Sequence, residues 1–136
     1  MLARNIELNG VEATVIPAAV DAFDGTVIME LGPLDYGHRV LYRPVAASSS
    51  VLEVNAISIP TILRRLGWDR VGLLKVDIEG HERKLLSKSC EWLNLVDALC
   101  IECHEGFGEE NLLRIARTCG FQRPENFGGI WLLQRS

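Results

Sequence analysis

The sequence predicts a single α/β domain in which helices cover a mostly parallel, doubly wound sheet. Three observations predict this fold class. Continuous apolar runs of strand length, such as residues 71–78 and 96–103, alternate with amphipathic helical segments, as in parallel sheets covered on both faces. The chain has 136 residues, of which 48% are hydrophobic, enough for the core of one domain. Two short extended pieces, 121–124 and 128–135, predict an antiparallel hairpin that closes the sheet.

The first half of the chain is predicted to be a helix end followed by strands. Residues 2–9 look like the last turns of a helix, because Gly10 follows where helices commonly end. The segments predicted to be extended are 11–20, 26–31, 38–43 and 51–58. The second and third of these form a hairpin, since GPLDYG between them favours a turn. A loop of small polar residues covers 44–50.

The second half is predicted to alternate helices with the two buried strands. Ser58 caps a helix that ends at Gly67. Gly80 opens a second helix, 80–93, directly after the first buried strand. A third helix follows the second buried strand and ends at Gly120.

Charge and hydropathy argue against several classes of function. The net charge is −4 and the Lys and Arg residues are dispersed, so we expect no nucleic-acid partner, which would need a concentrated basic face. No apolar run approaches the roughly 18 residues of a membrane span, and the first residues lack the apolar segment of an export signal. We therefore expect a cytoplasmic protein with no membrane partner, whose four cysteines are free thiols.

The segment LCIECHEG contains C-x-x-C-H, the pattern that attaches c-type haem. Its flanks are apolar and of strand length, and side chains along a strand alternate between the two faces of a sheet. Cys100, Glu102 and His104 then share one face, and Cys103 lies on the other. Because the two thiols point apart, this geometry disfavours haem and also a zinc site, which lacks a second pair of ligands.

An acidic cluster follows the two buried strands. The segment LLKVDIEGHE delivers Asp77 to the end of one strand, with Glu79 in the turn and Glu82 in the first helical turn. The next strand delivers Glu102 and His104 to the same edge, where ligands bind in open α/β sheets. Crowded carboxylates repel one another, which raises a pKa unless a cation lies among them. The acids could instead only cap a helix, but the matching pair on the neighbouring strand favours a functional rim.

The segment LLKVDIEGHERKLL resembles the fourth-strand region of FkbM-type, S-adenosylmethionine-dependent methyltransferases. These enzymes carry Asp-x-Glu-Gly-x-Glu there, which DIEGHE at 77–82 matches, and their next strand tends to end in Glu-x-His, which ECH at 102–104 matches. NIELNGVEATVIPAAV resembles the Asn-containing helix and third strand of the family. The usual Thr-Leu-Asp of the family is replaced by SIP at 58–60.

The resemblance implies an incomplete Rossmann-like methyltransferase sheet, in which this single domain, 1–136, corresponds to the C-terminal two-thirds. The Gly-rich cofactor turn of the family is absent, and GFGEEN at 106–111 lacks the third glycine of such a turn, so we interpret it as a loop with a helix cap. In that fold the missing strands lie between the third and fourth strands. We therefore expect these two strands to pair directly, to take a partner from another chain or to stay loose, and we predict a homodimer or a rearranged sheet.

The activity that the resemblance implies is O-methylation: transfer of a methyl group from S-adenosylmethionine to a hydroxyl of a small-molecule acceptor, a sugar or natural product. The catalytic candidates are Asp77, Glu79 and His104, with His104 suited by type to act as general base, and Glu82 is expected on the same rim. Alternatively, a divalent metal held by Asp77, Glu102 or His104 orients the acceptor oxygen.

On the cofactor side, Ala18, Ala19 and Asp21 are candidates for contacts near the adenine. A second hypothesis is a non-catalytic methyltransferase-like module or partner subunit, which the absent Gly-rich turn supports. A third is a metal-dependent hydrolase, which is weaker because His38 and His81 lie outside any convincing ligand spacing.

Overall fold

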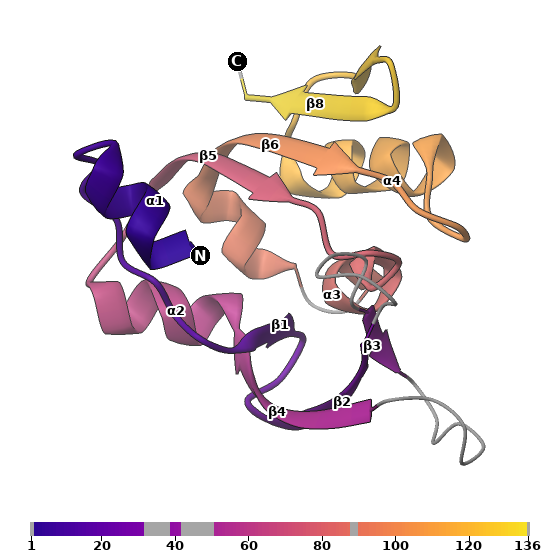
Figure 1. The fold of residues 1–136 in the computed structure, drawn as a ribbon. Helices are drawn as coiled ribbons and strands as arrows, with labels where there is room; N and C mark the ends of the chain where they lie inside the picture. The colour runs from indigo at the N-terminus through magenta and orange to yellow at the C-terminus, as the bar shows by residue number, and fades with distance from the viewer. Residues whose placement is uncertain (1, 32–38, 42–50, 88–89, 136) are drawn as a thin grey trace.

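The computed structural model describes residues 2–31, 39–41, 51–87 and 90–135 and shows a mixed α/β protein (Figure 1). Its strands form two four-stranded sheets, one above the other in Figure 1. The helices of the described residues are α1 (Leu2–Leu8), α2 (Ile59–Leu66), α3 (Glu82–Ser87), the 3-10 helix η1 (Glu91–Leu95) and α4 (Glu109–Cys119). In that part of the chain, no helix is long and apolar enough to cross a bilayer.

The first sheet has the strand order β1-β4-β2-β3 and the second β5-β6-β8-β7. Their strands are β1 (Ala19–Asp21), β2 (Gly25–Glu30), β3 (Arg39–Leu41), β4 (Val51–Ser58), β5 (Val71–Val76), β6 (Val96–Glu102), β7 (Glu125–Phe127) and β8 (Ile130–Gln134). In each sheet one pair is parallel, β1 with β4 and β5 with β6, and the other pairs are antiparallel. The prediction of a mostly parallel sheet is therefore wrong.

Both predicted hairpins are present. β2 pairs with β3, although residues 32–38 and 42–50, which include the predicted polar loop, lie outside the described residues. β7 pairs with β8, but its strand lies at Glu125–Phe127 and not at 121–124. Gly128 and Gly129 between them have φ of 65° and 101°, the left-handed backbone that a tight two-residue hairpin requires.

Local chemistry sets the ends of two helices where they were predicted. The Ser58 hydroxyl accepts a hydrogen bond from the Thr61 N–H at 3.4 Å, and Pro60 lies in the first turn of α2. α2 and α4 end at Gly67 and Gly120, each in the left-handed conformation.

Two predicted elements are shorter than expected. The strand predicted over 11–20 is reduced to β1, because residues 11–15 are exposed and Pro17 has no N–H to donate to a ladder. Of the helix predicted over 80–93, the structure shows α3, which begins at Glu82 and not at Gly80, and η1, while residues 88–89 lie outside the described residues.

The core lies between the second sheet and the helices α3, η1 and α4. Its fully buried side chains alternate along β6 and recur on the inner faces of the helices; the largest are Leu86, Leu93, Leu99, Ile101, Leu112 and Leu133. This core fixes the ends of β5 and β6 relative to α3.

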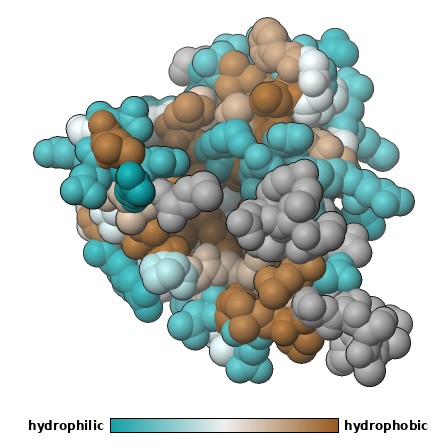
Figure 2. All heavy atoms as spheres, viewed as in Figure 1, coloured by the Kyte–Doolittle hydropathy of each residue, from teal (hydrophilic) through white to brown (hydrophobic). Residues whose placement is uncertain are grey.

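An apolar groove of about 260 Å³ separates the two sheets. It is lined by Val20 beside β4 and by Leu74 of β5, with Ile62 and Leu63 of α2. Figure 2 shows the hollow, with hydrophobic atoms on its floor. Thus β1 and β5, which correspond to the third and fourth strands of the predicted fold, do not pair directly: each is an edge strand of its own sheet.

A buried ionic cluster joins the two sheets. Asp21, at the end of β1, has no exposed surface. Its Oδ2 lies 2.8 Å from Lys84 Nζ and 3.1 Å from His81 Nε2, both from the α3 region, and its Oδ1 accepts from the Ala22 N–H. The Lys84 ammonium also lies over the Phe23 ring, 4.5 Å from its centroid.

Candidate functional site

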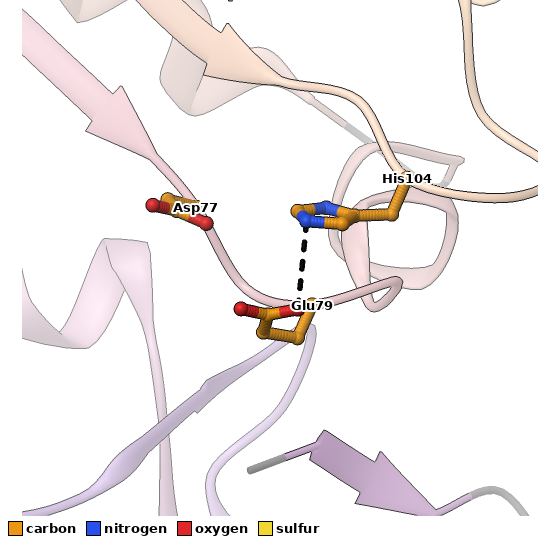
Figure 3. A group of neighbouring side chains, drawn as sticks. All are labelled: Asp77, Glu79 and His104. Atoms are coloured by element: carbon orange, nitrogen blue, oxygen red, sulfur yellow. Dashed lines mark ion pairs between the residues drawn. The ribbon is translucent and has the colours of Figure 1, made fainter. Parts of the chain in front are cut away.

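The candidate site lies where β5 and β6 end side by side (Figure 3). Asp77 directly follows β5, and His104 follows β6 by two residues. Between β5 and α3 the chain turns sharply: Glu79 has φ of 51° and Gly80 has φ of 94°. For a residue with a Cβ, the left-handed conformation costs about 1–2 kcal/mol, and such strain is concentrated at functional sites.

The turn brings three of the predicted residues together. Donor atoms of Asp77, Glu79 and His104 all lie within 4.8 Å of one another, and His104 Nε2 is 3.6 Å from Glu79 Oε2 (Figure 3). The His104 side chain is 24% exposed and that of Glu79 is 47% exposed, so a ligand in solvent can reach both. Asp77 forms an exposed ion pair with Lys75, whose Nζ lies 2.8 Å from its Oδ2.

Glu82 does not lie on the rim, contrary to the prediction. Its side chain is fully buried beneath the rim, and its Oε1 lies 2.7 Å from His104 Nδ1. The same oxygen accepts a hydrogen bond from the Gly80 N–H at 3.2 Å. His104 therefore has one ring nitrogen against a buried carboxylate and the other on the exposed side.

The electrostatics of the site favour a charged imidazole. Burial opposes the charge on His104, but the hydrogen bond to Glu82 and the carboxylates of Glu82, Glu79 and Glu102 outweigh it and raise the pKa of His104 above its ordinary value. The hydrogen bond to Asp77 raises the pKa of Lys75 in spite of the opposing desolvation.

The cysteines of the C-x-x-C-H sequence are free thiols and follow the predicted alternation. Cys103 packs against the hydrophobic core, where burial, with a smaller contribution from Glu82, raises its pKa to about 11. Cys100 neighbours Lys75 on the paired strand, and both are solvent-accessible. A thiol with a raised pKa is a poor nucleophile and a poor metal ligand at neutral pH.

The structure brings together two of the three metal ligands proposed from the sequence, Asp77 and His104. Glu102 is outside the cluster that the described residues form, and Glu79 takes its place beside Asp77 and His104. The Lys75 ammonium neutralises Asp77, and a cation bound there would meet its charge. This arrangement gives no support to a metal site.

The described residues do not fit the whole of an S-adenosylmethionine site. Ala18 and Ala19 are half-buried, but the carboxylate of Asp21 is buried and bound to Lys84, so it does not face a ligand. Gly108 caps α4 by donating its N–H to Asn111 Oδ1 at 3.1 Å. This agrees with the prediction that GFGEEN is a loop with a helix cap. Cofactor contacts of Ala18 and Ala19 remain predictions, whereas the predicted contact of the Asp21 carboxylate is at odds with its place in the buried cluster.

Three polar residues around the site were missed from the sequence as partners. His81 and Lys84 lie three positions apart and therefore share the face of the α3 region that meets Asp21. Lys75 lies two positions before Asp77 and so projects on the same side of the extended chain. Helical periodicity predicts that His81 and Lys84 share a face, and strand periodicity predicts that Lys75 and Asp77 share a side. Neither periodicity predicts which distant residue these side chains contact.

Together the fold and the rim define an α/β protein with a polar ligand site at the carboxyl ends of adjacent parallel strands. The sequence profile of the methyltransferase FkbM domain matches residues 12–132. The chain belongs to this methyltransferase family, as its motif at 77–82 predicted. No curated protein and no solved structure matches the chain.

Proposed function

We propose that the chain is an S-adenosylmethionine-dependent O-methyltransferase whose rim, Asp77, Glu79 and His104, receives the hydroxyl of a sugar or natural product. The single observation that carries the proposal is the placement of His104. Its Nδ1 is held by the buried Glu82, and its Nε2 is on the exposed side of the site. A histidine held in this way is suited to accept a proton from a bound ligand.

In this proposal His104 Nε2 takes the proton of the acceptor hydroxyl, and the resulting oxygen is the nucleophile that methyl transfer requires. Asp77 and Glu79 accept hydrogen bonds from neighbouring hydroxyls of the acceptor, as carboxylates commonly do in sugar sites. The negative charge of Glu79, with those of Glu82 and Glu102, also stabilises the imidazolium that forms when His104 is protonated.

A second candidate is a non-catalytic methyltransferase-like module or partner subunit. The observation that favours it is the engagement of Asp21 in the buried cluster, where its carboxylate is bound to Lys84. On this hypothesis the rim still binds a ligand or a partner, but no methyl donor is held beside it.

Calorimetric titration with S-adenosylhomocysteine separates the two. Saturable binding at micromolar affinity supports the enzyme. No heat of binding from a chain shown to be folded by circular dichroism supports the non-catalytic module. Asp77→Asn is a suitable companion variant, because it removes a rim charge without touching the buried cluster of Asp21.

A further inference from the structure

A buried carboxylate lies beneath the rim and makes contacts that a simple surface acid would not need. Glu82 has no exposed surface, and burial of a carboxylate is costly unless it is paired and hydrogen-bonded. Its Oε1 is near both Gly80 N–H and His104 Nδ1, whereas its Oε2 has no hydrogen-bond partner among the described residues. The interactions of this side chain are therefore concentrated on one oxygen atom.

That one oxygen connects the two strand ends that build the rim. The Gly80 N–H comes from the turn after β5, which presents Glu79 in its left-handed conformation. His104 comes from the chain after β6. Because both bind Glu82 Oε1, displacement of Glu82 would release the turn and the imidazole together, and the 3.6 Å approach of Glu79 to His104 would be lost.

The contact also determines which ring nitrogen carries the proton. A neutral imidazole has one N–H donor and one acceptor nitrogen, and the nitrogen within hydrogen-bond distance of a carboxylate is the donor. For His104 this is Nδ1, because Nε2 is 3.6 Å from the Glu79 carboxylate, beyond hydrogen-bond distance. With Nδ1–H donated to Glu82 at 2.7 Å, the lone pair of Nε2 is on the side of Glu79 and of solvent.

We propose that Glu82 is a positioning residue of the methyl-transfer site, which holds His104 in the Nδ1–H tautomer so that Nε2 faces the acceptor hydroxyl. The tautomer follows from the geometry alone, whereas the role of Nε2 toward a hydroxyl rests on the proposed function. A purely structural role is the alternative: Glu82 is in the first turn of the short helix α3, and its bond to Gly80 N–H has the character of a cap. A cap alone would not fix the imidazole.

The test is a long-range proton–nitrogen correlation spectrum of the imidazoles in the isotope-labelled chain, recorded at a pH above the titration of His104. The wild-type protein should show His104 as the Nδ1–H tautomer, and His81 in the same spectrum is an internal reference. Glu82→Met keeps a side chain of similar length but removes the oxygen that accepts from Nδ1–H, so we expect a mixture of tautomers or the Nε2–H form. Glu79→Gln, on the other side of the ring, is the matched control and should keep Nδ1–H.

The outcomes separate this proposal from the proposed function. An Nε2–H tautomer of His104 in the wild-type chain overturns the positioning role, whether or not any variant folds. An unchanged tautomer in folded Glu82→Met overturns it as well. If the tautomer changes, methyl transfer by Glu82→Met should fall about 10- to 100-fold in kcat with little change in KM, by analogy with outer carboxylates that orient metal-binding histidines. A changed tautomer with unchanged kcat supports the positioning of His104 and contradicts its role as general base.

Discussion

Replacement of Asp21 by asparagine should destabilise the fold through loss of the charge that joins the two sheets. The carboxylate is fully buried and binds Lys84 at 2.8 Å and His81 at 3.1 Å. Breaking a buried charge pair costs about 3–5 kcal/mol, mostly because the remaining charge is left unpaired. Because the Lys84 side chain is 31% exposed, its ammonium can be hydrated once the carboxylate is lost, so the expected cost falls to about 2–3 kcal/mol.

Thermal unfolding followed by circular dichroism measures this cost. For 136 residues the unfolding entropy scales to about 0.3 kcal/mol per degree, so Asp21→Asn should lower Tm by about 7–10 °C. The matched control is Asp97→Asn, which breaks the exposed ion pair with Arg70 and should leave Tm close to the wild-type value. Equal, small effects of the two variants would refute the idea that Asp21 joins the sheets.

The stabilisation by Asp21 should also depend on pH in a defined direction. Burial opposes ionisation of Asp21, but the Lys84 and Ala22 hydrogen bonds and the nearby positive charges prevail, and its pKa in the folded state is below the ordinary value of 3.8. A folded-state pKa below the unfolded one gives stability that is complete above the unfolded value and is lost as pH falls through the folded value. The difference in unfolding free energy between wild type and Asp21→Asn should therefore be constant near neutrality and shrink below about pH 4.

Three further predictions concern the rim and the open sheet edge. His104→Gln should lower kcat for methyl transfer by about 10²- to 10⁴-fold with little change in KM, and a retained kcat would exclude it as general base. Because the pKa of His104 is raised, kcat/KM should rise with pH through an inflection above the ordinary value of 6.5, and Glu79→Gln should move that inflection down; an unmoved inflection would show that another group titrates. Leu73, on β5, whose outer edge pairs with no strand of the described residues, is 62% exposed, so the chain should form homodimers that Leu73→Lys weakens and the control Leu52→Lys does not, as measured by light scattering; a monomer at every concentration would contradict this.

Features set by neighbours in the sequence were predicted well. The Ser58 cap and the left-handed Gly67 and Gly120 depend on a few adjacent residues, and all three lie where the sequence places them. The strands β5 and β6 were also found from their continuous apolar runs, but only β6 is buried as predicted: β5 is an edge strand in which Gly72, Leu73 and Lys75 are exposed. The rule that parallel strands present ligands at their carboxyl ends was enough to bring Asp77 and His104 together.

Features set by distant contacts were not predictable in the same way. Glu82 is in a motif that reads as three equivalent rim acids, yet it is buried because His104, 22 positions away, closes over it. Asp21 looked like a ligand-facing acid at a strand end, yet Lys84, 63 positions away, occupies it. Sequence spacing places a side chain on a helix or strand face, but the partner that covers that face comes from the tertiary fold.

Because the strands form two sheets, the buried carboxylates of Asp21 and Glu82 have different roles. No backbone hydrogen bonds pair β1 with β5 in the described part of the chain. Their relative position therefore depends on the apolar side chains that line the groove and on the Asp21 cluster. The rim, in contrast, is built within the second sheet, where β5 and β6 are paired and Glu82 holds their ends together. Loss of Asp21 should therefore disturb the position of β1 and of Ala18 and Ala19, while His104 keeps its Nδ1–H tautomer in any molecule that remains folded. A changed His104 tautomer in folded Asp21→Asn would show that the rim depends on contact between the sheets, and that the second sheet alone does not build it.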